Sequence, residues 1–262
     1  MPRRCARWRA SARSGQPPSA TPSSASGSRN RLITPSRGAA MRRQPDEPLK
    51  ECTKNQHGYY RGEKCQYCSE AGELVLSPRN LDQFGRIMAG VLRHFPDRFE
   101  LDMDQQGWVS AEEFITSVKF KRQNLGSLTM DHLRAVVETD PKGRYQLESG
   151  RLRATYAHSI ELDLDLPTDG VPEHLYFACS QEDSEEYLEQ GLYPLDRQMV
   201  HLSGTRLNAL EAGRHIIGKP VVLLVDVRAA EEAGKPIMKA GTTVYVTSEV
   251  LASCLRKLPD SA

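Results

Sequence analysis

The sequence predicts an α+β protein, and three observations carry that prediction. Apolar residues recur with helical spacing over residues 77–140 and a short β-ribbon follows, a combination typical of winged-helix-like domains. From residue 167 short strands alternate with short helices, which indicates a second, β-rich lobe. Before both lies a stretch that is poor in apolar residues but contains closely spaced Cys and His residues. We therefore expect a leader (1–48), a metal module (49–76), a winged-helix-like lobe (77–166) and a β-rich lobe (167–262).

The net charge of +1 over 262 residues hides an asymmetry. Residues 1–50 contain eleven Lys and Arg and two acidic residues, which leaves 24 basic and 32 acidic residues in the rest of the chain. The body is therefore acidic, and it can bind a polyanion only through a few concentrated cations. No apolar run approaches the roughly 20 residues of a membrane span. The clustered cysteines resemble metal ligands more than a disulfide framework, so we expect a cytoplasmic protein, by default a monomer.

Residues 1–48 are rich in Ser, Pro, Ala and Arg and show no apolar periodicity, so we expect this leader to be disordered. It lacks the apolar core of about 7–15 residues that a secretory signal needs. An organelle transit peptide, a basic tail that contacts nucleic acid, and translation from a start upstream of Met41 remain open interpretations.

The spacing C-x4-H-x7-C-x2-C indicates structural zinc, and it is formed by Cys52, His57, Cys65 and Cys68. The C-x2-C pair places two thiolates on one tight turn, and the upstream Cys and His can complete a tetrahedron. Four protein ligands leave no open position for catalysis, and a segment with so few apolar residues needs such a staple to fold. The alternatives are a loop with scattered cysteines and a redox C-x2-C, although a redox motif would need a strand–helix context that is missing here.

The expected helices and strands follow from caps and periodicity. Ser77-Pro78 begins a first helix that extends to Leu92, Ser110 and Glu113 form a capping box for a second, and a third begins at Thr129. In the β-rich lobe we expect strands at 174–179, 198–202, 220–227 and 243–247, and helices at 182–190, 207–212 and after Ser248. No dinucleotide-binding glycine motif, P-loop or hydrolase elbow is present, which disfavours those classes.

Arg93 and His94 stand at the end of the first predicted helix, just before Phe95-Pro96. Neighbouring residues on a helix point about 100° apart, so both can face one cleft only near a helix end, which Pro96 supplies. The simpler interpretation is an ordinary helix C-terminus, where cationic side chains offset the helix dipole.

Several segments form, in order, a recognisable pattern. They are Leu92-Arg93-His94, Lys142-Gly143-Arg144-Tyr145, Arg153-Ala154-Thr155-Tyr156-Ala157-His158-Ser159, Arg197-Gln198-Met199-Val200-His201-Leu202-Ser203 and Gly218-Lys219-Pro220-Val221-Val222-Leu223. In this order they resemble the RNA 2′-phosphotransferase family over about residues 81–258, and the metal module resembles that of archaeal members.

The resemblance implies a winged-helix lobe joined to an ADP-ribosyltransferase-like lobe, with the active site between them. It implies an enzyme that uses NAD to remove an internal 2′-phosphate from RNA, such as tRNA. The reaction would pass through a 2′-phospho-ADP-ribosylated RNA and release nicotinamide and ADP-ribose 1″,2″-cyclic phosphate. The family's catalytic set falls on Arg93, His94, Arg144 and Arg197. Guanidinium groups suit this substrate because they bind phosphate bidentately and stay charged.

On the NAD side the sequence departs from the family pattern. Where the family commonly has His-Gly-Thr the chain has Phe177, Ala178 and Cys179, Ala157 replaces the glycine of Gly-His-Ser, and Met199 replaces a histidine. We expect NAD to contact residues of these segments, namely Phe177, Ala178, Cys179, His201, Ser203 and Arg214. Two other functions stay open: ADP-ribosylation of terminal phosphates of RNA or DNA, and RNA binding without catalysis.

Overall fold

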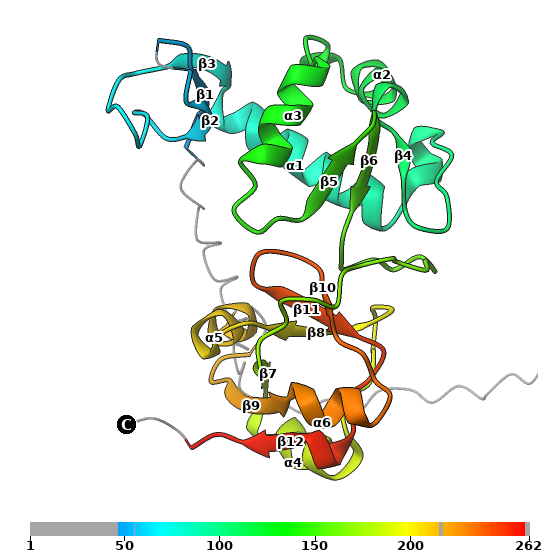
Figure 1. Ribbon diagram of the computed structural model, residues 1–262. Helices are drawn as coiled ribbons and strands as arrows, with labels where there is room; N and C mark the ends of the chain where they lie inside the picture. Colours follow the sequence, from blue (N-terminus) through cyan, green and yellow to red (C-terminus); the bar gives the residue numbers. More distant parts are fainter. Residues whose placement is uncertain (1–46, 55, 215–216, 260–262) are drawn as a thin grey trace, which may run out of the picture. The chain divides into compact units, whose positions relative to one another are not determined.

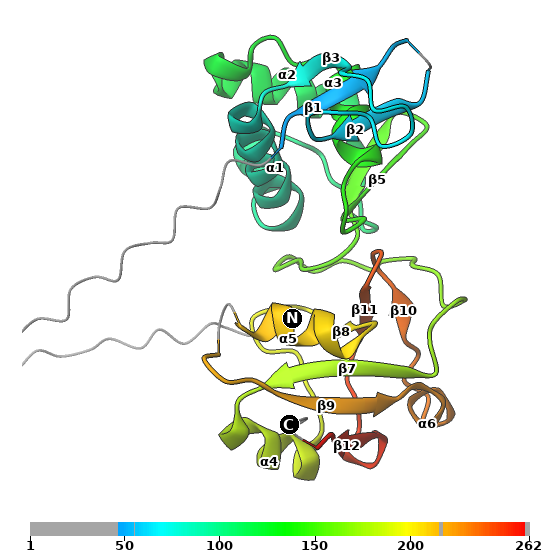
Figure 2. The same cartoon turned by 90° about the vertical axis from the view of Figure 1, so that its left-hand side faces the viewer.

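The computed structural model describes residues 47–54, 56–214 and 217–259 (Figures 1 and 2). Its described strands form three sheets, of which two have three strands and one has six. No helix in these residues is long and apolar enough to cross a membrane. Apart from residues 47 and 48, the predicted leader lies outside the described residues.

The metal module is built on an antiparallel sheet of order β2-β1-β3. The strands are β1 (Leu49–Cys52), β2 (Gly58–Arg61) and β3 (Glu73–Leu76). Leu49 and Leu76 are buried in the same hydrophobic core as the helices that follow. The sequence did not predict these strands. The module shares a hydrophobic core with the helices, and the predicted domain boundary at residue 76 stays a prediction.

The helical lobe contains α1 (Pro78–Arg93), α2 (Ala111–Lys121) and α3 (Met130–Glu138). The predicted N-caps are confirmed, because Ser77, Ser110 and Thr129 each accept a hydrogen bond from a backbone N–H in the first turn. Between the helices lie the short 3-10 turns η1 (Pro96–Phe99) and η2 (Gln123–Leu125). The apolar face of α1 packs against α2, α3 and a sheet of order β4-β6-β5.

That sheet consists of β4 (Val109–Ser110), β5 (Tyr145–Glu148) and β6 (Arg151–Ala154), all antiparallel. The β-ribbon predicted after the third helix is therefore confirmed as β5 and β6. The chain leaves β6 through residues 155–159, which we call the β6 exit segment.

The end of α1 depends on one close approach. The N–H groups of both His94 and Phe95 donate to the carbonyl of Gly90, and the Phe95 ring folds back over Gly90. A Cβ on Gly90 would lie 2.5 Å from the ring. This packing ends the helix at Arg93 and turns His94 out of the helical path.

The β-rich lobe contains one antiparallel sheet of order β10-β11-β8-β7-β9-β12. Its strands are β7 (His174–Cys179), β8 (Val200–Ser203), β9 (Val221–Asp226), β10 (Met238–Lys239), β11 (Val244–Thr247) and β12 (Leu255–Lys257). Its helices are α4 (Gln181–Gln190), α5 (Arg206–Arg214) and α6 (Val227–Glu232).

The helices α4 and α5 cover opposite faces of this sheet (Figure 2). On β7 the Phe177 ring meets Tyr187 of α4, whereas Ala178 meets Gly213 of α5. Successive residues of a strand point to opposite faces, so the two helices must lie on different sides.

The prediction of a helix after Ser248 is wrong. The chain forms a 3-10 turn, η3 (Ala252–Cys254), and then β12, which pairs with β9. The open edge of β9 decides this, because its backbone N–H and C=O groups need partners that a local cap signal does not reveal.

The close packing at Gly90 generates a matched prediction. Gly90→Ala should destabilise the fold and reduce activity, because the methyl group displaces Phe95 and with it the end of α1. Gly85→Ala in the same helix meets nothing within 4 Å and should stabilise the protein by about 0.5–1 kcal/mol through helix propensity. Urea unfolding of both variants measures the difference, and equal stabilisation by the two would contradict this account.

Candidate functional site

The β6 exit segment brings four of the predicted site residues together by hydrogen bonds. The Ser159 N–H donates to the carbonyl of Arg93 (3.0 Å), and the Ser159 hydroxyl bonds His94 Nδ1 (2.9 Å). The Ala157 N–H donates to His201 Nε2 (3.0 Å), and Arg197 Nη1 donates to the Ala157 carbonyl (2.7 Å). Residues from α1, from β8 and from the loop before β8 thus converge on one short stretch of backbone.

Arg93 holds a half-buried cation, and the described residues provide no anionic partner for it. Its guanidinium lies over the Tyr156 ring, 4.8 Å from the centroid. Nε and Nη2 are buried and have no hydrogen-bond acceptor among the described residues. Burial lowers the pKa of Arg93, although a guanidinium stays charged in proteins. A buried donor left without an acceptor is costly, so these atoms are suited to an incoming anion.

His94 is held as a neutral imidazole with one nitrogen already engaged. Its Nδ1 is bonded to Ser159, so Nε2 is the atom left to face a ligand. Partial burial lowers the pKa of His94, and the charges of Arg197 and Arg93 lower it further. A neutral imidazole can orient a phosphate or accept a proton near neutral pH.

Arg144 is clamped by a buried carboxylate. Its Nε lies 3.0 Å from both oxygens of Asp140, its Nη2 lies 2.5 Å from Oδ1, and its backbone N–H also donates to Asp140. The Asp140 side chain is only 1% exposed. This bonding raises the pKa of Arg144. The clamp fixes Nε and Nη2, and Arg144 lies close enough for its charge to lower the pKa of Arg93.

Arg197 is exposed in the loop before β8 and is anchored by its bond to the Ala157 carbonyl. Two more imidazoles lie beside it. Burial, followed by the charges of nearby arginines, lowers the pKa of His158 and of His201 to about 4 each. His158 is 3% exposed, and its Nε2 has no partner among the described residues. The histidines around the arginines are therefore neutral at pH 7 and add no repulsion.

A pocket of about 340 Å³ lies between β8, α5 and the turn before β11. His201 and Ser203, both predicted from the sequence, line it. Lys142, Tyr156, Asn208 and Glu211 also line it, and they supply a cation, an aromatic ring, an amide and a carboxylate. These groups suit a polar, partly aromatic ligand, with one cation and one carboxylate available to it.

The other predicted NAD contacts lie elsewhere. Phe177 packs edge-on against Tyr187, and Cys179 is 2% exposed in the core of the β-rich lobe. Ala178 lies against Gly213 of α5. Arg214 is exposed at the end of α5. None of these four residues lines the pocket that contains Ser203.

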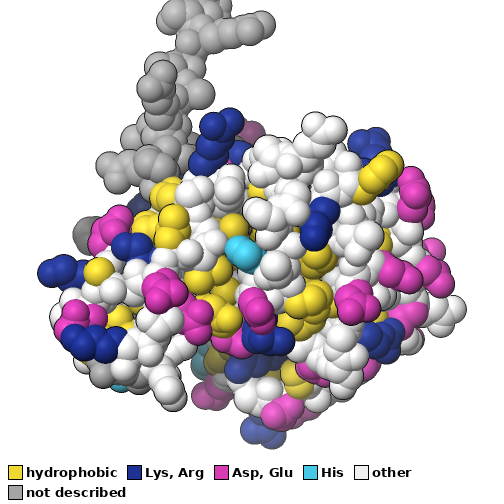
Figure 3. Space-filling model, turned by 90° about the horizontal axis from the view of Figure 1, so that it is seen from above, with side chains coloured by type: hydrophobic (Ala, Val, Ile, Leu, Met, Phe, Trp, Pro, Cys, Tyr) yellow, Lys and Arg dark blue, Asp and Glu magenta, His cyan; other side chains and the backbone are white. Residues whose placement is uncertain are grey.

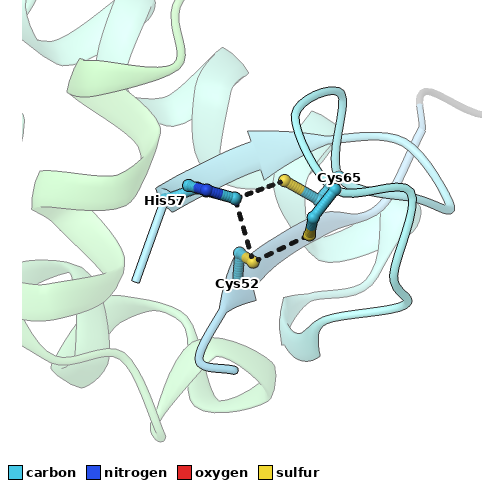
Figure 4. Close-up of side chains that lie close together, drawn as sticks. Cys52, His57 and Cys65 are labelled. Atoms are coloured by element: carbon cyan, nitrogen blue, oxygen red, sulfur yellow. Dashed lines mark hydrogen bonds between the residues drawn. The ribbon is translucent and has the colours of Figure 1, made fainter. Parts of the chain in front are cut away.

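The Cys and His residues of the metal module are drawn together as predicted (Figure 4). His57 Nδ1 lies 3.6 Å from Cys52 Sγ and 3.5 Å from Cys65 Sγ, and Cys52 Sγ lies 3.5 Å from Cys68 Sγ. Zinc–sulfur bonds of about 2.3 Å and zinc–nitrogen bonds of about 2.0–2.1 Å give tetrahedron edges of roughly 3.5–3.8 Å. The four ligand atoms all lie within 4.8 Å of one another, so the group fits a single zinc ion.

The ligand group also has support beyond its four atoms. Burial raises the pKa of the Cys65 thiol, but hydrogen bonds from the backbone of Tyr67 and Cys68 outweigh it and the net shift is downward. Behind the module, Arg61 Nε donates to Thr139, the residue before the Asp140 clamp. The module is thus tied to the helix that precedes Arg144.

One face of the molecule shows no charge pattern that would favour a polyanion. On the face shown in Figure 3 acidic and basic side chains are interspersed, and neither sign forms a continuous field. On this face no extended field adds to the local cations around the β6 exit segment.

Sequence reasoning missed the residues that support the arginines. No role was predicted for Asp140 or Tyr156, yet one clamps Arg144 and the other stacks on Arg93. The i,i+4 spacing of Asp140 and Arg144 was a detectable signal for the clamp. No local signal places Tyr156 over a residue 63 positions earlier.

Cations that are buried, or held in place with donors to spare, are typical of proteins that bind phosphate groups. Comparison with known proteins narrows this class. The chain belongs to the RNA 2'-phosphotransferase, Tpt1 / KptA family, whose model it matches over residues 79–249.

Curated relatives agree with this assignment. A probable RNA 2'-phosphotransferase of Thermoplasma acidophilum is 36% identical over 74% of this chain and 83% of the relative. A probable RNA 2'-phosphotransferase of Archaeoglobus fulgidus is 36% identical over 77% of this chain and 92% of the relative. That of Methanosarcina mazei is 35% identical over 81% of this chain and the full length of the relative.

The buried neutral His158 generates a pH prediction. An unfolded histidine takes up a proton near pH 6.5, whereas the folded protein resists protonation down to about pH 4. The unfolded state binds more protons in this window, so stability present at pH 7 is lost as the pH falls. Between pH 7 and pH 5 His158→Gln should lose less stability than the wild type, by on the order of 1–2 kcal/mol. Urea midpoints at both pH values check this, and parallel losses would contradict it.

Proposed function

We propose that this protein is an NAD-dependent RNA 2′-phosphotransferase that removes an internal 2′-phosphate from RNA, with a tRNA splice junction as the substrate type. The observation that carries the proposal is the buried guanidinium of Arg93, whose Nε and Nη2 lack acceptors beside Arg197 and the neutral His94. Family membership supports the RNA substrate. NAD would supply ADP-ribose to the 2′-phosphate, nicotinamide would leave, and ADP-ribose 1″,2″-cyclic phosphate would be released.

In this proposal each arginine binds a part of the negatively charged phosphates. Arg93 receives the 2′-phosphate through Nε and Nη2, a pair of donors with the spacing of two phosphate oxygens. Arg144, fixed by Asp140, and Arg197 hold the 2′-phosphate and the flanking phosphodiester. Because these groups are already oriented, they stabilise charge on the phosphoryl oxygens without reorganisation. His94 acts through Nε2 in the transesterification step, as an orienting group or an acid–base.

The NAD side is assigned to the pocket lined by His201 and Ser203. The Ser203 hydroxyl would contact ribose or pyrophosphate, and His201, neutral near pH 7, would border the site. Phe177, Ala178, Cys179 and Arg214 lie outside this pocket, so their proposed contacts with NAD rest on the family resemblance alone. We further propose that the helical lobe is a winged-helix-like RNA-binding domain and that the β-rich lobe is ADP-ribosyltransferase-like. A monomer in the cytoplasm, with one structural zinc ion at Cys52, His57, Cys65 and Cys68, completes the proposal.

One assay separates this function from the two alternatives. The protein is incubated with NAD and an RNA that carries one internal 2′-phosphate, beside the same RNA with a terminal phosphate only. Loss of the internal phosphate with release of the cyclic ADP-ribose phosphate supports the proposal. Stable ADP-ribosylation of a terminal phosphate would replace it with the first alternative. RNA binding without any nicotinamide release would replace it with the second.

The arginine assignments predict a specific defect. Arg144→Ala and Arg197→Ala should each slow the second, phosphate-releasing step by about 100-fold or more and accumulate 2′-phospho-ADP-ribosylated RNA, because the phosphoryl charge loses its cation. Gel analysis of radiolabelled RNA detects this species. Arg228→Ala is the matched control, since Arg228 is an exposed arginine on α6 that pairs only with Glu232 among the partners found for it. Full turnover by both site variants would refute the assignment.

The metal module predicts about one zinc per chain in protein purified without chelator. Cys65→Ser should abolish zinc binding and lower the melting temperature, because the module has few apolar residues to hold it together. Cys254→Ser provides the control, since Cys254 is equally buried but lies outside the ligand group. Elemental analysis measures the metal, and a wild-type protein free of zinc and other metals would overturn the site.

A further inference from the structure

Ala157 adopts a backbone conformation that is unfavourable for its side chain. Its φ is +67°, in the left-handed region that glycine occupies readily and that costs other L-residues about 1–2 kcal/mol. Such strain persists only where the surrounding structure enforces it, and it gathers at functional sites. At Ala157 the enforcing contacts can be named.

Both backbone polar groups of Ala157 are used by candidate site residues. Its N–H donates to His201 and its carbonyl accepts from Arg197, which lie 44 and 40 positions further along the chain. A right-handed or extended Ala157 would redirect these two groups. The left-handed turn therefore fixes both residues at once. The peptide group before the Cα of Ala157 holds His201, and the peptide group after it holds Arg197.

Two residues later, Ser159 forms hydrogen bonds with two groups at the end of α1. Its N–H holds the Arg93 carbonyl, and its hydroxyl holds His94 Nδ1, 65 positions away in sequence. Because Nδ1 is engaged, the ring is oriented with Nε2 free for a ligand. Tyr156, just before Ala157, and His158, between Ala157 and Ser159, are both buried and anchor the β6 exit segment.

From this juxtaposition we propose that Ala157 and Ser159 are positioning residues, which set the geometry of Arg93, His94, Arg197 and His201 through a strained left-handed turn. The kinetic part of this inference rests on the proposed function, whereas the structural part does not. Neither residue needs to contact the substrate. Because both ends of the segment are hydrogen-bonded, it fixes Arg93 on α1 relative to Arg197 in the loop before β8.

The chain contains a matched control for the strain itself. Ser149, in the β5–β6 hairpin, also has a positive φ (+47°), is exposed, and touches none of the site residues discussed here. Ala157→Gly and Ser149→Gly should both raise the melting temperature, by about 2–4 °C each, with turnover kept. Ala157→Val and Ser149→Val should both lower it, because a β-branched residue is a poor fit to the left-handed region.

Only the valine variant at position 157 should harm the site. We expect kcat to fall about 10–100-fold in Ala157→Val with a smaller change in KM, and no loss in Ser149→Val. The imidazole NMR signals of His94 and His201 should shift in Ala157→Val alone. Equal kinetics and unshifted histidine signals in the folded Ala157→Val protein would overturn the role of Ala157.

The role of Ser159 is tested by removing its hydroxyl and then restoring it. Ser159→Ala should lower kcat and change the ¹⁵N shifts and pH titration of His94, and Ser159→Thr should restore both. Failure of threonine to rescue either, or an unchanged His94 in Ser159→Ala, would overturn the role of Ser159. A wild type without turnover of 2′-phosphorylated RNA would refute the proposed function, and the NMR comparison would still decide the positioning role.

Discussion

The burial of one guanidinium constrains the rest of the candidate site. Moving the charge of Arg93 out of water costs several kcal/mol unless other groups compensate, and here the compensation comes from the face of Tyr156 rather than from a carboxylate. A carboxylate partner would occupy the very donors that a phosphate needs. The nearby histidines fit the same requirement, since burial and the arginine charges keep His94, His158 and His201 neutral. The site thus concentrates positive charge in arginines alone, which cannot lose it by deprotonation.

Among the described residues one carboxylate pairs with a site arginine, and it does so in a different geometry. Asp140 binds Arg144 through Nε, Nη2 and the backbone N–H, so the clamp fixes orientation through one edge of the guanidinium. Thr139, next to Asp140, receives a hydrogen bond from Arg61 of the metal module. The module also shares its core with α1 and α3 through Leu49 and Leu76. The metal module is therefore tied to the C-terminal end of α3, just before the residue that clamps Arg144.

Much of the fold could be predicted from local pattern. The helices that begin after Ser77, Ser110 and Thr129 are confirmed at their caps, and β7, β8, β9 and β11 lie close to the expected ranges. The failures occur where pairing with a distant strand decides. β12 replaced a predicted helix because β9 offered an edge, and β1 to β3 were missed because their short strands alternate with ligand-bearing turns.

By itself the sequence predicted which residues would carry the chemistry, from the spacing of the four candidate metal ligands and from the family positions of Arg93, His94, Arg144 and Arg197. These are properties of residue type and order, which are readable along the chain. Only the tertiary structure decided that Nε and Nη2 of Arg93 are buried beside Tyr156, that Phe177 and Cys179 pack into the sheet core, and that Ala157 turns left-handed to meet Arg197 and His201. Burial and backbone partners come from segments 40 or more residues apart, and local periodicity contains no information about them.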